Sequence, residues 1–380
     1  MARLGDICTV VSGSTPKSNI SEFWDGDVKW ITPAEIDDDS YIITDSVRHI
    51  TKLGVAKTGL KPFPAGTVIL SSRAPIGKTA IAGCEMYCNQ GFKNLICSEQ
   101  IDSKYLYFFL SGKTDFLNSL GRGATFKEIS KSIVENIEIP LPKVDEQQEI
   151  AARFEKINYL IRLRTQQLTK LDELVKARFV EMFGAETDFA KWPCCTVGEV
   201  ANVCVGVVIK PTQYYASEGI PAFRSLNIGE MQVNDSNWVF FTEEGQQKNQ
   251  KSIIRENDVL VVRSGTPGTA CVTTKKYDGY NAVDIIIARP DNTKINSTFL
   301  AMFTNLPHGM NQIKEKIGGA AQKHFNVSGY KSLKLILPPI IFQNEFASYV
   351  ERTDSSRLTI RQSLDKMEVL KKSLMQEYFG

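Results

Sequence analysis

The sequence has little of what marks several common classes of protein. No stretch of its 380 residues approaches the ~18 consecutive apolar residues of a membrane span, and its N-terminus has no signal-peptide pattern. Of the eight cysteines, Cys8, Cys204 and Cys271 lie in apolar runs, which is typical of reduced thiols in a cytoplasmic protein. Cys84 and Cys88 have no second pair at zinc-site spacing, so we expect no structural metal.

Catalytic motifs are missing as well. There is no Walker A motif and no G-x-G-x-x-G after a strand, which argues against an ATP-driven motor and a dinucleotide-binding fold. The Asn/Asp-Pro-Pro-aromatic motif of amino-methyltransferases is absent, because Leu337-Pro338-Pro339-Ile340 lacks the amide or carboxylate that would hold the amine. Only three histidines occur, and His49 has no counterpart in the similar second half of the chain, so we expect no paired Ser-His-Asp or Cys-His sites. These absences argue against an enzyme, while the net charge of +2 neither indicates nor excludes a nucleic-acid partner.

One stretch of the sequence occurs twice. Residues 137–184 return as residues 333–380, with about fourteen identical positions. Gln147 matches Gln343, and the closing Phe183-Gly184 matches Phe379-Gly380. Each copy begins as a short apolar strand that ends in Leu-Pro. A long segment without Gly or Pro follows, which predicts a helix that stops at the glycine.

Both predicted helices carry a heptad seam, whose positions follow one another at alternating steps of three and four. Arg164 and Arg178 interrupt the first seam, and Arg357 and Lys371 the second, which is expected to fix the register of the helix pair. The second helix starts with Ile340-Ile341-Phe342 where the first is polar, so we expect this end to be buried against the preceding domain or a partner. The residues expected to pair the helices are Phe154, Ile157, Ile161, Leu168, Leu171, Leu364, Met367 and Leu374.

The remainder of the chain repeats too. Gly206 matches Gly13, residues 259–268 match 68–77, and residues 319–323 match 123–127. Residues 66–72 and 79–82 predict a hairpin, 105–110 a buried helix or strand, and 133–140 a final strand. The predicted divisions are a first domain (1–142), a first helix (143–184), a second domain (185–338) and a second helix (339–380).

Cations gather at the turns and loops of both domains. An Arg in a hairpin tip can bind guanine O6 and N7, a Lys can bind phosphate, and a Gln can read adenine. The alternative for each tip is a solvated turn, and for the helices a core within the chain. The residues that we expect to contact DNA are Arg73, Lys78, Arg122, Lys127, Arg224, Arg263, Gln322 and Lys323.

Together these features resemble the specificity (S) subunit of type I restriction-modification systems, over essentially the whole chain. Gly123–Ile129, Ile137–Pro142 and Glu146–Ile150 look like the family's G-x-x-Q-K-x-I, I-x-I-P-x-P and E-Q-x-x-I signature. The opening Leu-Gly-Asp-Ile, followed by a Gly-x-Thr-Pro turn, is also similar to the family. The departures from the pattern are Phe126 for Gln, Phe342 for Glu, Asn344 for Gln, and Val207-Val208-Ile209 for the Ser-Thr-Pro turn.

The resemblance implies an α+β protein with two mixed α/β target-recognition domains in a pseudo-twofold repeat, separated by two long antiparallel coiled-coil helices. Each domain is then expected to read one half of a bipartite, asymmetric double-stranded DNA target. The paired helices would set the spacer and dock two modification (methyltransferase) subunits, which bind S-adenosylmethionine. Restriction subunits would add ATP- and Mg-dependent translocation and cleavage, so this chain itself would be non-catalytic and need no cofactor.

Two other functions stay open at this point. A two-domain coiled-coil protein-interaction scaffold would show no salt-dependent affinity for DNA. A nuclease or methyltransferase with an unrecognised site would need an acidic pair or an S-adenosylmethionine pocket, which a ligand-binding assay on the isolated chain would detect.

Overall fold

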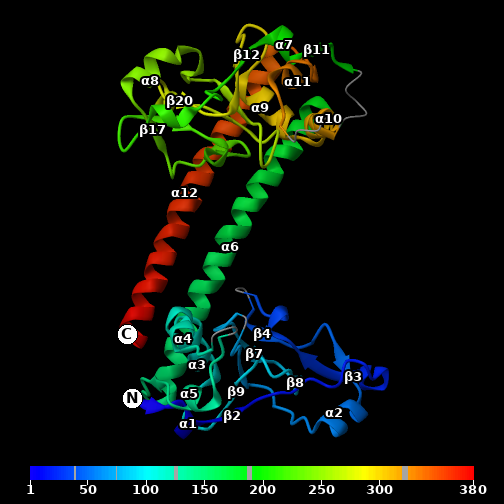
Figure 1. The fold of residues 1–380 in the computed structure, drawn as a ribbon, viewed down its shortest axis with the longest axis vertical. Helices are drawn as coiled ribbons and strands as arrows, with labels where there is room; N and C mark the ends of the chain where they lie inside the picture. Colours follow the sequence, from blue (N-terminus) through cyan, green and yellow to red (C-terminus); the bar gives the residue numbers. More distant parts are fainter. Residues whose placement is uncertain (38–39, 74, 124–126, 186–190, 319–323) are drawn as a thin grey trace. The chain divides into compact units, whose positions relative to one another are not determined.

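The computed structural model describes the chain except residues 38–39, 74, 124–126, 186–190 and 319–323. The chain forms two compact units: unit 1 is Met1–Thr165 with Gln362–Gly380, and unit 2 is Gln166–Arg361. Each unit joins a globular part of mixed helices and strands to half of each of two long helices, α6 (Val144–Phe183) and α12 (Ile340–Phe379) (Figure 1). In the described part of the chain, no helix is both long and apolar enough to span a membrane.

The globular part of unit 1 contains a larger and a smaller sheet. The larger has the strand order β2-β9-β6-β7-β4 and the smaller β5-β3-β8, while β1 and β10 pair separately. The predicted hairpin is confirmed, because β6 and β7 pair antiparallel with Leu70 opposite Thr79. The strands are β1 (Ala2–Arg3), β2 (Cys8–Val11), β3 (Trp24–Ile31), β4 (Ile42–Ile43), β5 (His49–Ile50), β6 (Val68–Leu70), β7 (Thr79–Ala82), β8 (Tyr87–Cys88), β9 (Asn94–Cys97) and β10 (Glu138–Ile139).

The helices of unit 1 settle one prediction and correct another. Residues 105–110 are helical, within α3, whose N-cap Asp102 accepts hydrogen bonds from the next backbone amides. The strand predicted over 133–140 is wrong in its first part. Ser130 Oγ accepts the amide N–H of Ile133 and starts a helical turn, so only β10 remains extended. The helices are α1 (Leu4–Ile7), α2 (Lys52–Thr58), α3 (Ser103–Ser111), α4 (Thr114–Leu120) and α5 (Lys131–Glu135).

Unit 2 repeats this arrangement. Its sheet β12-β21-β18-β19 has the same order as β2-β9-β6-β7, and its sheet β13-β17-β14-β20 repeats the parallel pair β3-β8 as β14-β20. The strands are β11 (Cys194–Thr196), β12 (Ala201–Val205), β13 (Tyr215–Ala216), β14 (Ile220–Phe223), β15 (Ile228–Gly229), β16 (Gln232–Val233), β17 (Val239–Phe241), β18 (Val259–Val262), β19 (Ala270–Val272), β20 (Asn281–Ala282), β21 (Ile285–Pro290) and β22 (Lys334–Ile336). The helices are α7 (Val197–Val200), α8 (Glu243–Lys248), α9 (Ser297–Asn305), α10 (Pro307–Gly318) and α11 (Val327–Lys331).

The central strand of unit 2 is buried on both faces. Val259 and Val261 of β18 pack with Phe299 of α9, whereas Leu260 and Val262 pack in a separate apolar cluster on the other face. Strand β6 of unit 1 alternates in the same way, between a cluster with α3 and a second cluster. Strands covered on both faces need apolar residues at every position, which explains the continuous runs VIL and VLVV.

The halves of the two long helices contact each other within each unit. In unit 2 they run antiparallel, because Arg178 pairs with Glu345 (3.2 Å) and the earlier Asp172 pairs with the later Arg357 (2.6 Å). In unit 1 the Phe154 ring lies 5.7 Å from that of Phe379 and stacks on it. Phe154 and Ile157 are buried, and the other predicted pairing residues are half-buried, namely Ile161, Leu168, Leu171, Leu364, Met367 and Leu374.

The apolar start of α12 is not buried against the preceding domain, which was one of the two expectations for it. Ile341 is 70% exposed and Phe342 43% exposed, so unit 2 does not cover this end of the helix. The centroid of the Phe342 ring lies 6.3 Å from that of the Trp192 ring. The alternative expectation, a partner molecule, stays a prediction.

A buried glutamine ties each long helix to its domain. Gln147 in the first turns of α6 accepts the amide N–H of Asp102 (2.8 Å) and donates to the carbonyls of Gln100 (3.0 Å) and Pro142 (2.9 Å). Gln343 makes the same three bonds in unit 2, to Asn296, Lys294 and Pro338. Both side chains are fully buried, so the recurring glutamine holds the start of the helix, the strand before it and the cap of α3 or α9 in one frame.

Candidate nucleic-acid interface

Glu128 gathers the predicted DNA-contacting residues of unit 1. Its amide and carbonyl exchange hydrogen bonds with Arg122 (2.9 and 3.0 Å), and it forms a backbone bridge with Arg73. Its carboxylate accepts a bond from the ammonium of Lys93 (3.0 Å), which also donates to Ser72 Oγ (3.3 Å). The hairpin tip and the basic loop are therefore brought together at one place.

The cations at this place differ in how free they are. Arg122 and Lys127 are exposed, and neither has an ion-pair partner among the residues that the structure describes. Arg73 is half-buried. Lys78 is half-buried too, and its ammonium donates to the carbonyl of Ile36 in the same unit. Arg122 and Lys127 of the loop thus present unpaired positive charge, whereas Lys78 at the end of the hairpin tip already donates a hydrogen bond within the unit.

In unit 2, Asp284 binds Arg263, one of the predicted DNA-contacting residues. The Arg263 guanidinium donates to Asp284 Oδ1 (2.5 Å) and to the carbonyl of Phe325 (3.0 Å), and its side chain is 15% exposed. The amide of Asp284 donates to the carbonyl of Val207 (3.2 Å). Asp284 sits in the left-handed region with φ 50°, which forms the tight turn between β20 and β21. Arg263 is therefore positioned by this turn and has little surface left for a ligand.

Arg224 lies beside the same turn. It follows Phe223, whose carbonyl accepts the amide of Val283 (2.8 Å), and its guanidinium donates to the carbonyl of Asn237 (2.6 Å). Its Nε is buried and has no hydrogen-bond partner in the described structure. The two other predicted contacts of this unit, Gln322 and Lys323, lie outside the described residues.

The bonds that hold the loop to the hairpin are equivalent in the two units, but the side chains at the equivalent positions differ. The residue that precedes the α5 cap, Ile129, donates its amide to the carbonyl of Ser72 (2.9 Å), just as Phe325 before the α11 cap donates to Arg263 (3.1 Å). These bonds align Ser72 with Arg263 and Glu128 with His324, whereas the strand register aligns Lys93 with Ile286. The cation of the ion pair is Lys93, just before β9, in unit 1 and Arg263, just after β18, in unit 2. The chemistry that the two units offer at one fold position is different.

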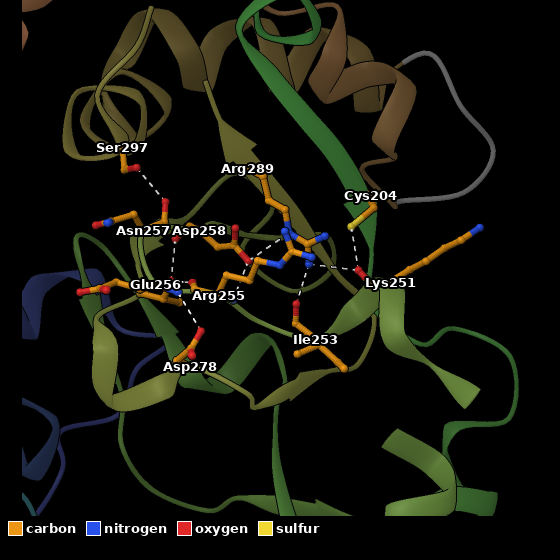
Figure 2. Close-up of polar contacts among 11 residues, drawn as sticks. Cys204, Lys251, Ile253, Arg255, Glu256, Asn257, Asp258, Asp278, Arg289 and Ser297 are labelled. Carbon is orange, nitrogen blue, oxygen red and sulfur yellow. Dashed lines mark hydrogen bonds and ion pairs between the residues drawn. The ribbon is translucent and has the colours of Figure 1, made fainter. Parts of the chain in front are cut away.

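A second polar cluster in unit 2 fixes the segment that leads into β18 (Figure 2). Asp258 is 2% exposed and accepts the amide of Arg255 (2.9 Å) and the Nε–H of Arg289 (3.4 Å). Arg289 also donates to the carbonyls of Ile253 (2.5 Å) and Lys251 (3.2 Å). Burial raises the pKa of the Asp258 carboxyl, and the bonds from Arg255 and Arg289 oppose that rise. The cluster has a structural role, because the Asp258 carboxylate and the Arg289 guanidinium bind each other and the neighbouring backbone.

Sequence reasoning missed the residues that organise these sites. Glu128 lies in the signature segment Gly123–Ile129, but Lys93 and Asp284 lie in segments that the sequence analysis did not single out, because a single charge in a loop gives no hint of its partner. Gln147 and Gln343 carried a usable signal, the identity of the two repeats, and the structure gives the physical reason for it. In the described residues, no cluster of three or more His, Cys, Asp or Glu suits a metal ion.

Comparison with known proteins agrees with this architecture. The family model "Type I restriction modification DNA specificity domain" matches residues 1–173 and 190–369. The specificity subunit of the type I restriction enzyme MjaIX from Methanocaldococcus jannaschii is 28% identical over 372 residues, which cover 92% of this chain and 85% of that protein.

Solved structures show the same fold. The S subunit of a type I restriction-modification system from M. genitalium has a TM-score of 0.60 at 15% identity, covering 100% of this chain and 95% of that one. A chain from a structure of type I restriction-modification complex assembly and conformational transition has a TM-score of 0.62 at 17% identity, covering 100% and 96%. The predicted α+β fold with two similar mixed α/β domains and two long helices is confirmed. The chain belongs to the type I restriction-modification DNA specificity family.

Proposed function

We propose that the chain is the DNA-specificity subunit of a type I restriction-modification enzyme, in which each unit reads one half of a bipartite, asymmetric double-stranded DNA sequence. One observation carries the proposal. The two units share a fold and a buried glutamine frame, yet equivalent positions carry different groups: Ser72 and Glu128 in unit 1 correspond to Arg263 and His324 in unit 2. Two copies of one frame with different surfaces suit the reading of two different half-sites.

The proposal assigns separate tasks to the parts of the chain. Residues 1–142 and 185–338 are the recognition domains, and the helices 143–184 and 339–380 set the unread spacer and dock two modification subunits. Those subunits supply S-adenosylmethionine and adenine methylation, and restriction subunits supply ATP- and Mg-dependent cleavage in the cytoplasm. This chain then contributes no catalytic group. Arg73, Lys78, Arg122, Lys127, Arg224, Gln322 and Lys323 remain its proposed DNA contacts, whereas the guanidinium of Arg263 is bonded to Asp284 and Phe325.

Methylome sequencing tests the proposal directly. The chain is co-expressed with the modification subunit encoded beside it, and methylated adenines are mapped in host DNA. We expect a split motif, methylated on both strands, that disappears when this chain is deleted. Methylation of that motif without the chain would contradict the proposal and favour the protein-interaction scaffold.

A second measurement separates the scaffold from the specificity subunit. The assembled complex is titrated with a duplex that carries the split motif, and with a scrambled duplex, at several salt concentrations. A specificity subunit gives salt-dependent affinity and at least ~10³-fold preference for the motif. A scaffold gives no preference between the two duplexes.

A further inference from the structure

The segment that follows β12 in unit 2 exposes an unusual apolar tip. Val208 is 47% exposed and Ile209 80% exposed, and the next residue, Lys210, is exposed as well. Exposing neighbouring β-branched apolar residues costs free energy in water, so such a tip is retained where it meets another surface.

The tip stands on a rigid base. Val207 is buried, its amide donates to the carbonyl of Ala282 (2.8 Å), and its carbonyl accepts the amide of Asp284 (3.2 Å). A Cβ at Gly206 would lie 2.6 Å from the Ala282 carbonyl oxygen, so only glycine allows this approach. Lys210 then adopts the left-handed conformation (φ 43°, ψ 54°), which turns the chain away after Ile209. The exposed pair is therefore a fixed projection.

The equivalent turn of unit 1 has the opposite character. Ser14 donates its amide to the carbonyl of Cys88 (3.0 Å), as Val207 does to Ala282, which fixes the alignment of the two turns. At the position of Val208, Thr15 donates its hydroxyl to Gln90 Oε1 (2.5 Å), and at the position of Ile209, Pro16 is buried. The same fold position is thus polar and folded back in unit 1, but apolar and exposed in unit 2.

The surroundings of the tip indicate what it meets. A groove of about 570 Å³ runs from its base, lined by Gly206, Val207 and the segment 247–252 with its exposed amides and lysines. Lys248 is paired with Glu244, but Lys210 and Lys251 have no ion-pair partner in the described part of the chain. Arg289 fixes the backbone of Lys251, whose side chain extends away from the polar cluster (Figure 2). Val207, at the foot of the tip, also accepts the amide N–H of Asp284, which binds Arg263. Free cations beside an apolar projection match a polyanion that also offers apolar groups, which describes duplex DNA.

We propose that Val208 and Ile209 make an apolar contact with the base pairs of the half-site read by unit 2, while Lys210 and Lys251 hold the flanking phosphates. This inference rests on the proposed function. Two parts of DNA offer the apolar chemistry: the methyl group of thymine in the major groove, and the faces of a base step that a side chain partly unstacks. The equivalent turn of unit 1, at Thr15 and Pro16, has no such projection, so the half-site of unit 1 is read without this contact.

Affinity measurements on the assembled complex test the inference. Fluorescence anisotropy with the cognate duplex compares the wild type with Ile209→Ser and Ile209→Leu. We expect Ile209→Ser to weaken binding by about ten-fold and to relax the methylated motif at one position of the half-site of unit 2. Ile209→Leu keeps an apolar group and is expected to bind within about three-fold of the wild type. Val47→Ser, at a similarly exposed residue of unit 1, is the control and leaves the half-site of unit 2 unchanged.

The remaining variants assign the source of the contact. Replacing each thymine of the half-site by uracil weakens wild-type binding at one position if a methyl group is contacted, and that effect is absent in Ile209→Ser. Equal binding of every uracil duplex, together with the loss in Ile209→Ser, assigns the contact to a base step. Lys210→Ala and Lys251→Ala are expected to weaken all sequences alike and to lower the salt slope by about one each.

Three outcomes would overturn the inference while leaving the proposed function intact. One is an unchanged affinity and motif in Ile209→Ser. Another is a loss of assembly with the modification subunit in that variant, which would make the tip a protein contact. The third is a relaxation confined to the half-site of unit 1. A failure of the proposed function looks different, because the wild-type complex would then bind cognate and scrambled duplexes equally.

Discussion

Unit 1 and unit 2 carry their ion pairs at different positions of the same fold. Lys93 before β9 bonds to Glu128, whereas Asp284 before β21 bonds to Arg263. Each pair links an inner strand to a loop that is predicted to contact DNA. The frame beneath them is the same, down to the three hydrogen bonds of Gln147 and Gln343.

The difference teaches how one fold serves two targets. The conserved element is a set of backbone-directed bonds, which hold loops without dictating their sequence. The variable elements are the ion pair between the loops (Lys93–Glu128 or Arg263–Asp284) and the turn that follows β2 or β12. A domain can therefore exchange its contact surface while keeping the helix pair and the strands that carry it.

The largest expected effect tests whether the frame is shared. Gln147→Met and Gln343→Met each leave one buried amide and two buried carbonyls without partners, so we expect each to cost about 3 kcal/mol of unfolding free energy. Urea unfolding of the full-length chain measures the cost, and hydrogen exchange in α3 and α9 identifies the unit that opens. The exposed Gln148→Met is the control and is expected to change little. A large cost in one unit and none in the other would show that the frame is not equivalent.

The next effect concerns the two charge ties. The Lys93 side chain is 9% exposed and that of Arg263 15%, whereas Glu128 and Asp284 are each 40% exposed. Because the cation is the more buried partner, we expect Lys93→Met and Arg263→Met to cost about 1–2 kcal/mol each, with Lys93 the larger. Double-mutant cycles with Glu128→Gln and Asp284→Asn measure the coupling, expected at about 1 kcal/mol in both units. A coupling free energy near zero in one unit would mean that its ion pair does not contribute to stability.

A smaller effect separates free cations from engaged ones. Arg122→Ala and Lys127→Ala are each expected to weaken DNA binding by the assembled complex about five-fold and to lower the salt slope by about one. Arg263→Met is expected to leave the salt slope unchanged, because its guanidinium is already bonded to Asp284 and Phe325. Lys57→Ala, at an exposed lysine in the last turn of α2, is the control. An equal loss of slope for Arg122 and Arg263 would remove the distinction.

The sequence was sufficient for much of this architecture because its strongest signals are periodic. The heptad positions predicted a seam on each long helix, and the repeat indicated two such helices and a hairpin in each domain. It failed at Ile133, where a single capping serine turns an apolar run into a helix. For Ile341 it left unit 2 and a partner as alternatives, and unit 2 leaves this residue exposed. The loop pairings escaped prediction because Lys93 and Glu128 lie far apart in the chain, and one sequence holds no record of which charges meet.

The smallest effect concerns an aromatic contact in each unit. The Arg48 guanidinium lies 3.8 Å from the centroid of the Trp24 ring, whereas the Lys276 ammonium lies 5.3 Å from the centroid of Tyr277. Cation–π attraction at exposed sites is worth about 0.5–1 kcal/mol and weakens with distance, so we expect Arg48→Met to cost more than Lys276→Met. Lys276 also pairs with Asp235, and Asp235→Asn, which removes that ion pair, allows its share to be subtracted. Urea unfolding of the three variants decides the order. A larger cost for Lys276→Met after the subtraction would reverse the comparison, and would place the stronger aromatic anchor in unit 2.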